Sequence, residues 1–263
     1  MQTKIIASVL RAAKVLEYLA QEGTGQIKDI SAKTGLPKST THRILKTLEQ
    51  ARLTSSDTSG SYFLGSLALG LAASPILAHR YLTMCSLKEM LRLREISGET
   101  VNLHVLLGSQ RLCLQEVPSP HDLRYTAGVG STVPIYVGSA GKMLLAQLGE
   151  DEAEALIDTI DIKRVGPNTI TDKRRLLKEV ARARTSQYST SFGERLVGSA
   201  SISAPIKNYT MPACLSILGL KDRFTRMPEI TKDMQRSAKK ISDKLASNFP
   251  IRPMGDVGTN EMG

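Results

Sequence analysis

The chain has 263 residues, of which 41% are hydrophobic and 23% charged, so it can bury the cores of two globular domains. No apolar run is long enough to cross a bilayer, and the three cysteines and four histidines are scattered, so we expect no membrane partner, disulfide framework, metal site or cofactor. The formal net charge is +10, and half of this excess lies in residues 1–80, an asymmetry typical of modules that bind polyanions.

The amino-terminal segment MQTKIIASVLRAAKVLEYLAQEG predicts an amphipathic helix, not a secretion signal. Its apolar residues recur at three- and four-residue intervals, which is the helical period. Arg11, Lys14 and Glu17 interrupt what would be the apolar core of a signal peptide. We therefore expect a cytoplasmic protein whose first helix ends near Gly23.

A helix-turn-helix unit follows. A second short helix, with Ile27 and Ile30 on its apolar side, leads to the turn TGLP. In this turn Gly35 can take a positive φ, and Pro37 suits the start of a helix. The third predicted helix covers residues 38–49 and buries a stripe around Ile44, Leu45 and Leu48. Helix, glycine-containing turn and helix form the DNA-binding motif.

The third helix has the chemistry of a recognition helix. Its first turn places hydroxyl and ammonium groups where free backbone N–H groups and the helix dipole favour phosphate. The face opposite the apolar stripe carries polar and basic side chains that can reach base edges. The alternative is a three-helix scaffold that binds no nucleic acid. The residues predicted to bind duplex DNA are Lys38, Ser39, Thr40, His42, Arg43 and Lys46.

A hairpin with a polar tip is predicted after this helix. Residues 51–54 and 61–64 flank the turn sequence SSDTSG, which is typical of the wing of a winged helix. The wing and the local basic excess together favour duplex DNA. Single-stranded nucleic acid is disfavoured, because the chain has no tryptophan and only 4% aromatic residues on which bases could stack.

Residues 65–74 are small and apolar nearly all round, so a helix here needs cover on more than one side. Either a second copy of the chain or the chain's own carboxy-terminal domain can provide it. Beyond Arg80 the alternation of patterns predicts an α+β sheet covered on one or both faces, and the tail from Pro250 is expected to fray. Helices are expected near 81–97, 139–148, 151–158, 171–186 and 228–247, and strands near 101–107, 111–117, 132–137, 199–207 and 213–220.

Two segments of this second part can hold a ligand. SAGK, from Ser139, opens a helix directly after a strand, where an anion can approach free N–H groups. In GSASISAP, Ser199, Ser201 and Ser203 share one face of a strand. The alternative is that Ser139 only caps its helix and that the serines only contact water.

An enzyme is the rival class of protein. Cys113 and His104 could act as nucleophile and base, but no nucleophile motif surrounds them. Cys113 stands between two leucines, which favours a buried strand position. We therefore assign no catalytic residue and expect the chain not to be an enzyme.

Five segments resemble the IclR-type transcription regulators over about residues 5–247: SVLRAAKVLEYLA, IKDISAKTGLPKSTTHRILKTLEQARL, YFLG, TVPIYVGSAGKMLLAQL and FGERLVGSASISAPI. The resemblance implies dimers and dimers of dimers, which favours a dimer contact for the linker. It also implies an α+β protein with a winged helix-turn-helix at 1–64, a linker helix at 65–80 and a GAF-like effector-binding domain at 81–249. The flexible tail expected from composition then covers 250–263.

The resemblance also implies that a small organic acid binds between the SAGK and GSASISAP segments. An effector that prefers one arrangement of the dimer is expected to change operator affinity by linkage. Ser191 and Ser201 stand where the family can have an aspartate and a cysteine, and Leu218 replaces a hydroxyl. This departure predicts a carboxylate effector with an apolar or aromatic body. The alternative is a carboxy-terminal domain that only oligomerises. The effector contacts carried over to matching positions are Ser139, Ala140, Ser191, Ser201 and Ser216.

Overall fold

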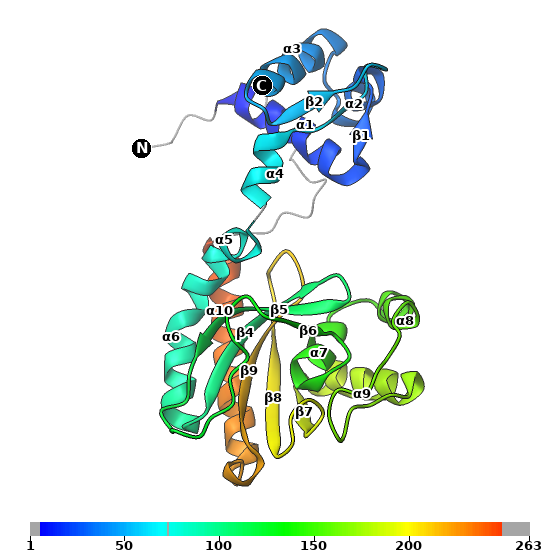
Figure 1. The fold of residues 1–263 in the computed structure, drawn as a ribbon. Coiled ribbons are helices and arrows are strands. Elements are labelled where there is room, and N and C mark those ends of the chain that lie inside the picture. Colours follow the sequence, from blue (N-terminus) through cyan, green and yellow to red (C-terminus); the bar gives the residue numbers. More distant parts are fainter. Residues whose placement is uncertain (1–5, 73, 249–263) are drawn as a thin grey trace. The chain divides into compact units, whose positions relative to one another are not determined.

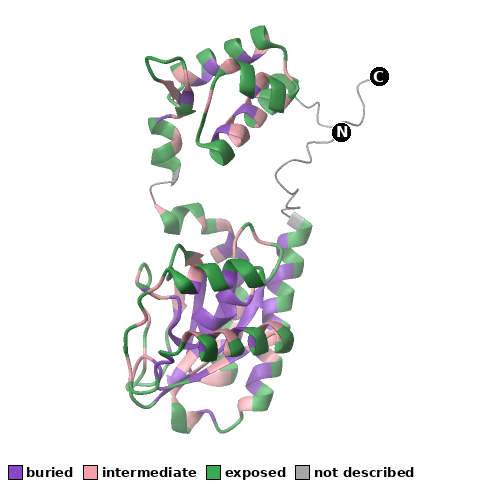
Figure 2. Ribbon diagram, turned by 90° about the vertical axis from the view of Figure 1, so that its right-hand side faces the viewer, coloured by how far each residue is buried: buried purple, intermediate pink, exposed green. Residues whose placement is uncertain are grey.

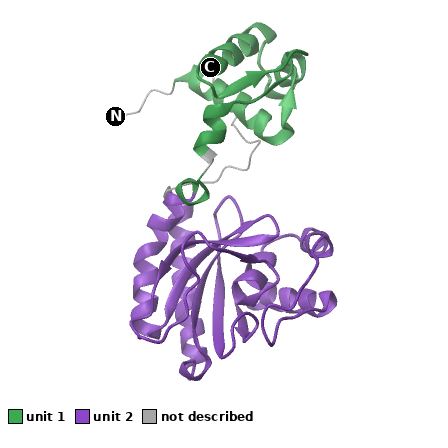
Figure 3. Cartoon of the chain, in the orientation of Figure 1, with its two compact units in different colours: residues 1–78, 253–263 green, residues 79–252 purple. Residues whose placement is uncertain are grey.

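The computed structural model describes residues 6–72 and 74–248. They form two compact units whose boundary in the sequence lies between Ala78 and His79 (Figure 3). No helix among the described residues is long and apolar enough to cross a membrane. The tail expected at 250–263 lies outside the described residues.

The first unit packs three helices against a small antiparallel sheet of strand order β1-β3-β2. Its elements are α1 (Ala7–Glu22), β1 (Thr24–Gly25), α2 (Ile27–Thr34), α3 (Lys38–Gln50), β2 (Thr54–Ser56) and β3 (Tyr62–Leu64). The helices and the sheet enclose one core, because each contributes apolar residues to the same side. Its buried members are Val15, Leu19, Ile30, Leu45, Leu48 and Tyr62.

The predicted helix-turn-helix and its hairpin are confirmed. Gly35 follows α2 with a φ of 70°, and Pro37 directly precedes the first residue of α3. Of the predicted stripe on α3, Leu45 and Leu48 are buried, whereas Ile44 is half-buried. The sequence did not predict β1, because its two residues pair with β3 only once the chain has folded back.

The linker is broken into two short helices, α4 (Ser66–Ala72) and α5 (Pro75–Ala78), where one helix was expected. Pro75 begins α5, as expected of a residue that cannot donate a hydrogen bond inside a helix. On α4, Leu69 and Leu71 are 63% and 68% exposed. The expectation that something covers this apolar side stays a prediction.

The second unit is built on a six-stranded sheet of order β6-β5-β4-β9-β8-β7, in which all neighbours are antiparallel. Its strands are β4 (Thr100–Leu107), β5 (Gln110–Val117), β6 (Thr132–Pro134), β7 (Ser189–Phe192), β8 (Ser199–Ile206) and β9 (Ala213–Leu220). Its helices are α6 (Arg80–Ser97), α7 (Gly138–Leu145), α8 (Glu150–Asp158), α9 (Lys173–Ser186), the 3-10 helix η1 (Lys221–Arg223) and α10 (Met227–Asn248). The predicted α+β class is confirmed.

Helices cover both faces of this sheet (Figure 1). One core lies between the strands and the pair α6 and α10, and a second surrounds α7, α8 and α9. The central strands are buried between these layers (Figure 2). Alternation along β8 sends Ala200, Ile202 and Ala204 into the first core, so the intervening serines face α7.

Candidate functional site

The residues predicted to contact DNA lie on the solvent side of α3. Thr41, Leu45 and Leu48 are buried on its other side, which fixes the orientation of the helix on its own unit. The predicted contacts are therefore available to a partner. Lys38, Ser39, His42, Arg43 and Lys46 are exposed, and Thr40 is half-buried.

Lys46 differs from its neighbours because its ammonium already has partners. Lys46 Nζ lies 2.7 Å from Glu49 Oε2 and 5.9 Å from the centre of the Tyr62 ring. The hydrogen bond to Glu49 raises the pKa of Lys46. Glu49 also accepts a hydrogen bond of 2.7 Å from Ser56 Oγ on β2. Lys46 and Glu49 thus connect the third helix to the wing.

One cavity in the second unit is lined by all five residues predicted to contact an effector. The cavity holds about 40 Å³ and lies between the sheet and the start of α7. Leu218, which replaces a hydroxyl of the family pattern, also lines it. The structure therefore brings together Ser139, Ala140, Ser191, Ser201 and Ser216.

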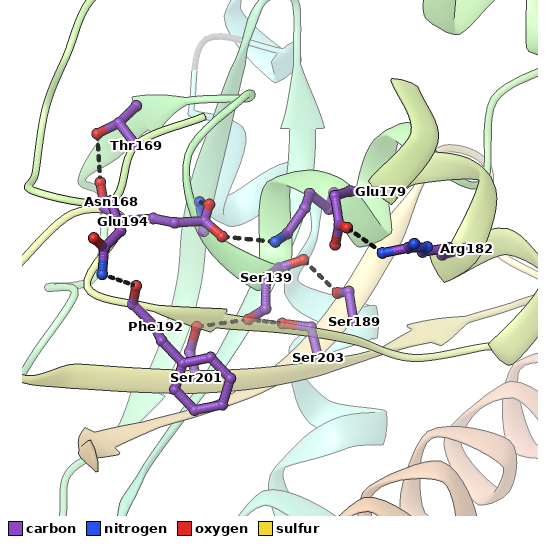
Figure 4. A network of polar contacts seen from close by, with 12 residues as sticks. Ser139, Asn168, Thr169, Glu179, Arg182, Ser189, Phe192, Glu194, Ser201 and Ser203 are labelled. Atoms are coloured by element: carbon purple, nitrogen blue, oxygen red, sulfur yellow. Dashed lines mark hydrogen bonds and ion pairs between the residues drawn. The ribbon is translucent and has the colours of Figure 1, made fainter. Parts of the chain in front are cut away.

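A chain of hydroxyl groups crosses one wall of this cavity. Ser139 Oγ lies 2.7 Å from Ser201 Oγ and 2.8 Å from Ser203 Oγ (Figure 4). Ser203 Oγ in turn lies 2.6 Å from Ser216 Oγ. The alternative role of Ser139 as a helix cap is wrong, because the residue that caps α7 is Val137 and its side chain makes no capping bond. The alternative that the serines of β8 only contact water is wrong as well, because Ser203 is fully buried.

The start of α7 already holds a carboxylate that belongs to the chain. Glu194 Oε2 accepts a hydrogen bond of 2.8 Å from the Gly138 N–H, and Glu194 Oε1 lies 2.6 Å from Lys142 Nζ. Both charged side chains are buried. Lys142 and Glu194 stand in separate segments of the sequence, and nothing in either segment predicts that they pair. The helix terminus expected to receive a ligand's anion is therefore partly occupied by Glu194.

A second polar pair in the lining was missed altogether. Arg111, on β5, and His104, on β4, are 8% and 2% exposed, and Arg111 Nη1 lies 3.2 Å from His104 Nε2. Arg111 Nε has no hydrogen-bond partner among the described residues. The sequence contains only a weak signal for the pair, because β5 also carries Glu116, and His104 is one polar residue in the apolar run of β4.

Burial governs the charges of this pair. It lowers the pKa of His104 well below its ordinary value, with a further contribution from the positive charge of Arg111, so the imidazole is neutral at neutral pH. Burial also lowers the pKa of Arg111, to about 10, which still leaves the guanidinium charged. Arg195 lines the same cavity, and no described lining residue is acidic. The cavity is therefore electropositive.

The rival catalytic pair is poorly suited to nucleophilic chemistry. Cys113 and His104 are cross-strand partners, but burial raises the pKa of the Cys113 thiol to about 12. The thiol therefore stays protonated at neutral pH and is a weak nucleophile. Within the described residues, no group of three His, Cys, Asp or Glu side chains could hold a metal ion.

Known families match both units. The family described as "IclR helix-turn-helix domain" matches residues 8–58, and "Bacterial transcriptional regulator IclR C-terminal" matches residues 76–243. The HTH-type transcriptional regulator KipR of Bacillus subtilis (strain 168) is 29% identical over 244 residues, which are 90% of this chain and 96% of KipR. The HTH-type transcriptional repressor AllR of Escherichia coli (strain K12) is 31% identical over 235 residues, 86% of each chain.

A solved structure adds a ligand to this comparison. It is an IclR homolog from Microbacterium hydrocarbonoxydans in complex with 4-hydroxybenzoate. Its sequence is 25% identical, the TM-score is 0.58, and the match covers 91% of this chain and 99% of that one.

Proposed function

Because this chain belongs to the IclR family of DNA-binding transcription regulators, we propose that α3 reads a duplex operator and that a small organic acid in the cavity of the second unit changes operator affinity. The relatives are regulators and not enzymes. The observation that carries the effector proposal is the meeting of five residues, chosen by sequence resemblance, around one cavity.

On the DNA side, α3 supplies both kinds of contact. Lys38, Ser39 and Thr40 stand in its first turn, where backbone N–H groups and the helix dipole attract phosphate. His42 and Arg43 are exposed one turn further and can reach base edges, while Lys46 must exchange Glu49 for a phosphate. The protein acts as a cytoplasmic dimer whose two copies contact each other through the apolar side of α4. Because such a dimer has two-fold symmetry, the two half-sites of its operator are symmetric.

On the effector side, 4-hydroxybenzoate in the related structure supports an aromatic acid as the ligand. The cavity of about 40 Å³ is smaller than the roughly 300–1,000 Å³ of a typical ligand pocket. Such a ligand therefore has to displace part of the wall. The turn at 193–198 borders the cavity through Arg195 and Leu196, and its Val197 is 76% exposed. If this turn moves when the ligand enters, the ligand binds the moved conformation of the protein more tightly than the unmoved one. Such a difference in affinity is the condition for ligand binding to change DNA binding.

The test starts from the full-length protein and a random pool of duplexes, from which bound sequences are selected. Fluorescence anisotropy then compares a selected duplex with its scrambled version, with and without 4-hydroxybenzoate. We expect the selected duplex to bind roughly 10³-fold more tightly or better, and the acid to change its affinity by about 5- to 150-fold. Equal binding of both duplexes would contradict operator reading. If a panel of organic acids changes nothing, the second unit only oligomerises.

A further inference from the structure

We propose that Arg111, held by His104, is the residue that binds the carboxylate of the effector. This inference rests on the proposed function, because it assumes that the ligand enters this cavity. It goes further in assigning the anion to one side chain of β5 and not to the start of α7. It also defines the ligand as a carboxylate with a second polar oxygen at its other end.

Arg111 is a buried charge with no counter-ion in direct contact, although the charge of Glu194 acts on it from beyond ion-pair distance. It is 8% exposed, and its hydrogen bond goes to His104 Nε2, an uncharged acceptor. Arg111 makes no ion pair with a described acidic residue. Burying a cation without an anion is costly, so the folded protein carries an electrostatic penalty that a bound carboxylate would remove.

The anion sites at the start of α7 are already occupied, and Arg195, the other arginine of the lining, is only half-buried. Lys142 is neutralised by Glu194 at 2.6 Å, and the Gly138 N–H donates to the same carboxylate. A ligand's anion at the start of α7 would have to displace Glu194 or lie beside it with the same sign of charge. Arg111 offers a guanidinium fork with Nε unpartnered, the geometry that suits bidentate binding of a carboxylate.

His104 acts as a positioning residue for this fork. An arginine has donors only, so His104 Nε2 must accept the hydrogen bond from Arg111 Nη1. This bond orients the guanidinium and uses only its Nη1 group, so the other N–H groups do not bind His104. A register irregularity between Leu103 and His104 occurs in the pairing of β4 with β5, as is common beside binding sites.

The remaining lining residues define the rest of the ligand. Ser201 and Ser216 on the sheet and Ser139 on α7 supply hydroxyls that can donate or accept, while Ala140 and Leu218 are apolar. A small carboxylate with an apolar body and a hydroxyl or carbonyl oxygen matches this lining. A neutral amide of the same shape does not satisfy Arg111.

The experiment compares paired acids and amides on the full-length protein. Isothermal titration calorimetry measures 4-hydroxybenzoate against 4-hydroxybenzamide, and pyruvate against its amide, for wild type, Arg111→Met and Arg111→Lys. We expect wild type to prefer an acid over its amide by about tenfold or more, Arg111→Met to lose this preference, and Arg111→Lys to keep part of it. Arg174→Met, an exposed site on α9, is the matched control and should behave as wild type.

Thermal denaturation without ligand gives an independent reading. Removing an uncompensated buried charge should leave the melting temperature of Arg111→Met equal to or above that of wild type. If Arg111 only stabilises the fold, Arg111→Met should instead have a lower melting temperature. A lower melting temperature together with an intact preference for acids would overturn the proposal. If amides bind as tightly as acids and both change operator affinity, Arg111 is not the anchor but the effector site stands. If no acid or amide binds at millimolar concentration, the effector half of the proposed function fails, and Arg111 with it.

Discussion

Lys142 Nζ lies 2.6 Å from Glu194 Oε1, and both side chains are buried. The second oxygen of Glu194 accepts the N–H of Gly138, so this carboxylate connects the first turn of α7 to the turn that precedes β8. Figure 4 shows Glu194 beside the Ser139 network that lines the cavity. The ion pair therefore fixes Glu194 to the start of α7, so the movement proposed for the turn at 193–198 involves residues 195–198.

Breaking this ion pair should destabilise the second unit. Lys142→Met or Glu194→Gln leaves one partner buried without an opposite charge, and each should lower the free energy of unfolding by about 3–5 kcal/mol. The double variant should lose less than the sum of the two, since no charge is stranded. Urea denaturation followed by circular dichroism is the measurement, because the chain has no tryptophan. Lys163→Met, which breaks the exposed pair with Asp161, is the control and should cost less than about 1 kcal/mol. Strictly additive losses would contradict the coupling.

Substitutions on α3 should separate base contacts from phosphate contacts. Arg43→Ala should weaken binding to a selected operator by about 1–3 kcal/mol and hardly affect a random duplex. Lys38→Ala should weaken both and reduce the slope of log affinity against log salt by about 0.9. Anisotropy titrations over a range of salt concentrations test both, with Arg174→Ala as the control. If Arg43→Ala lowers both affinities equally, Arg43 contacts phosphate.

Strong periodicity made most elements predictable. The helices α1, α6 and α10 and the strands β4, β5, β8 and β9 lie within a few residues of the expected ranges. The strand expected at 132–137 ends at Pro134, because the next residues form a turn closed by the Val137 N–H and the Pro134 carbonyl. The strand β7 was missed because three of its four residues are polar and it has no alternation. It is defined only by its pairing with β8.

The sequence predicted the site residues that belong to a motif, and it did not predict those that only the strand order brings together. The five effector positions stand in segments that resemble the family. Arg111 and His104 stand outside them, and an arginine is exposed by default, so only the order of strands shows that it is buried. Glu194 and Gly138 do stand in such segments, but they are 56 positions apart, and only the fold brings them together.

Glycine at position 141 is required by a close approach. A Cβ on Gly141 would lie 1.9 Å from the Ile135 carbonyl oxygen, which is backbone and cannot turn away. Gly141→Ala should therefore lower the free energy of unfolding by about 3 kcal/mol. Gly70→Ala, in α4, is the control, since a Cβ there meets nothing within 4 Å, and it should raise stability by about 0.5–1 kcal/mol. Equal effects at the two positions, measured by urea denaturation, would contradict the packing of α7.

His104 should make stability fall in mild acid. Its folded pKa is lowered, so below the ordinary value of about 6.5 the unfolded chain binds a proton that the folded chain does not. Stability is complete above that pH and declines as the pH falls, by at most about 1.4 kcal/mol per pH unit. His104→Gln should flatten the decline between pH 7.5 and pH 5. Burial also lowers the pKa of His79, so His79→Gln is measured alongside. An unchanged slope in His104→Gln would show that another group titrates.

The serine hydroxyls have one more consequence. In the run Ser201–Ser139–Ser203–Ser216, either oxygen of each contact can be the donor. Rotating the hydroxyls together reverses the polarity of the whole run at little cost, so the same wall can present a hydrogen to a ketone or a lone pair to an alcohol. A ligand that donates or accepts a hydrogen bond at one end of the run would then set the direction of every hydroxyl along it, without any movement of the backbone. Such a wall would let regulators of this kind acquire new effectors without rebuilding the sheet beneath them.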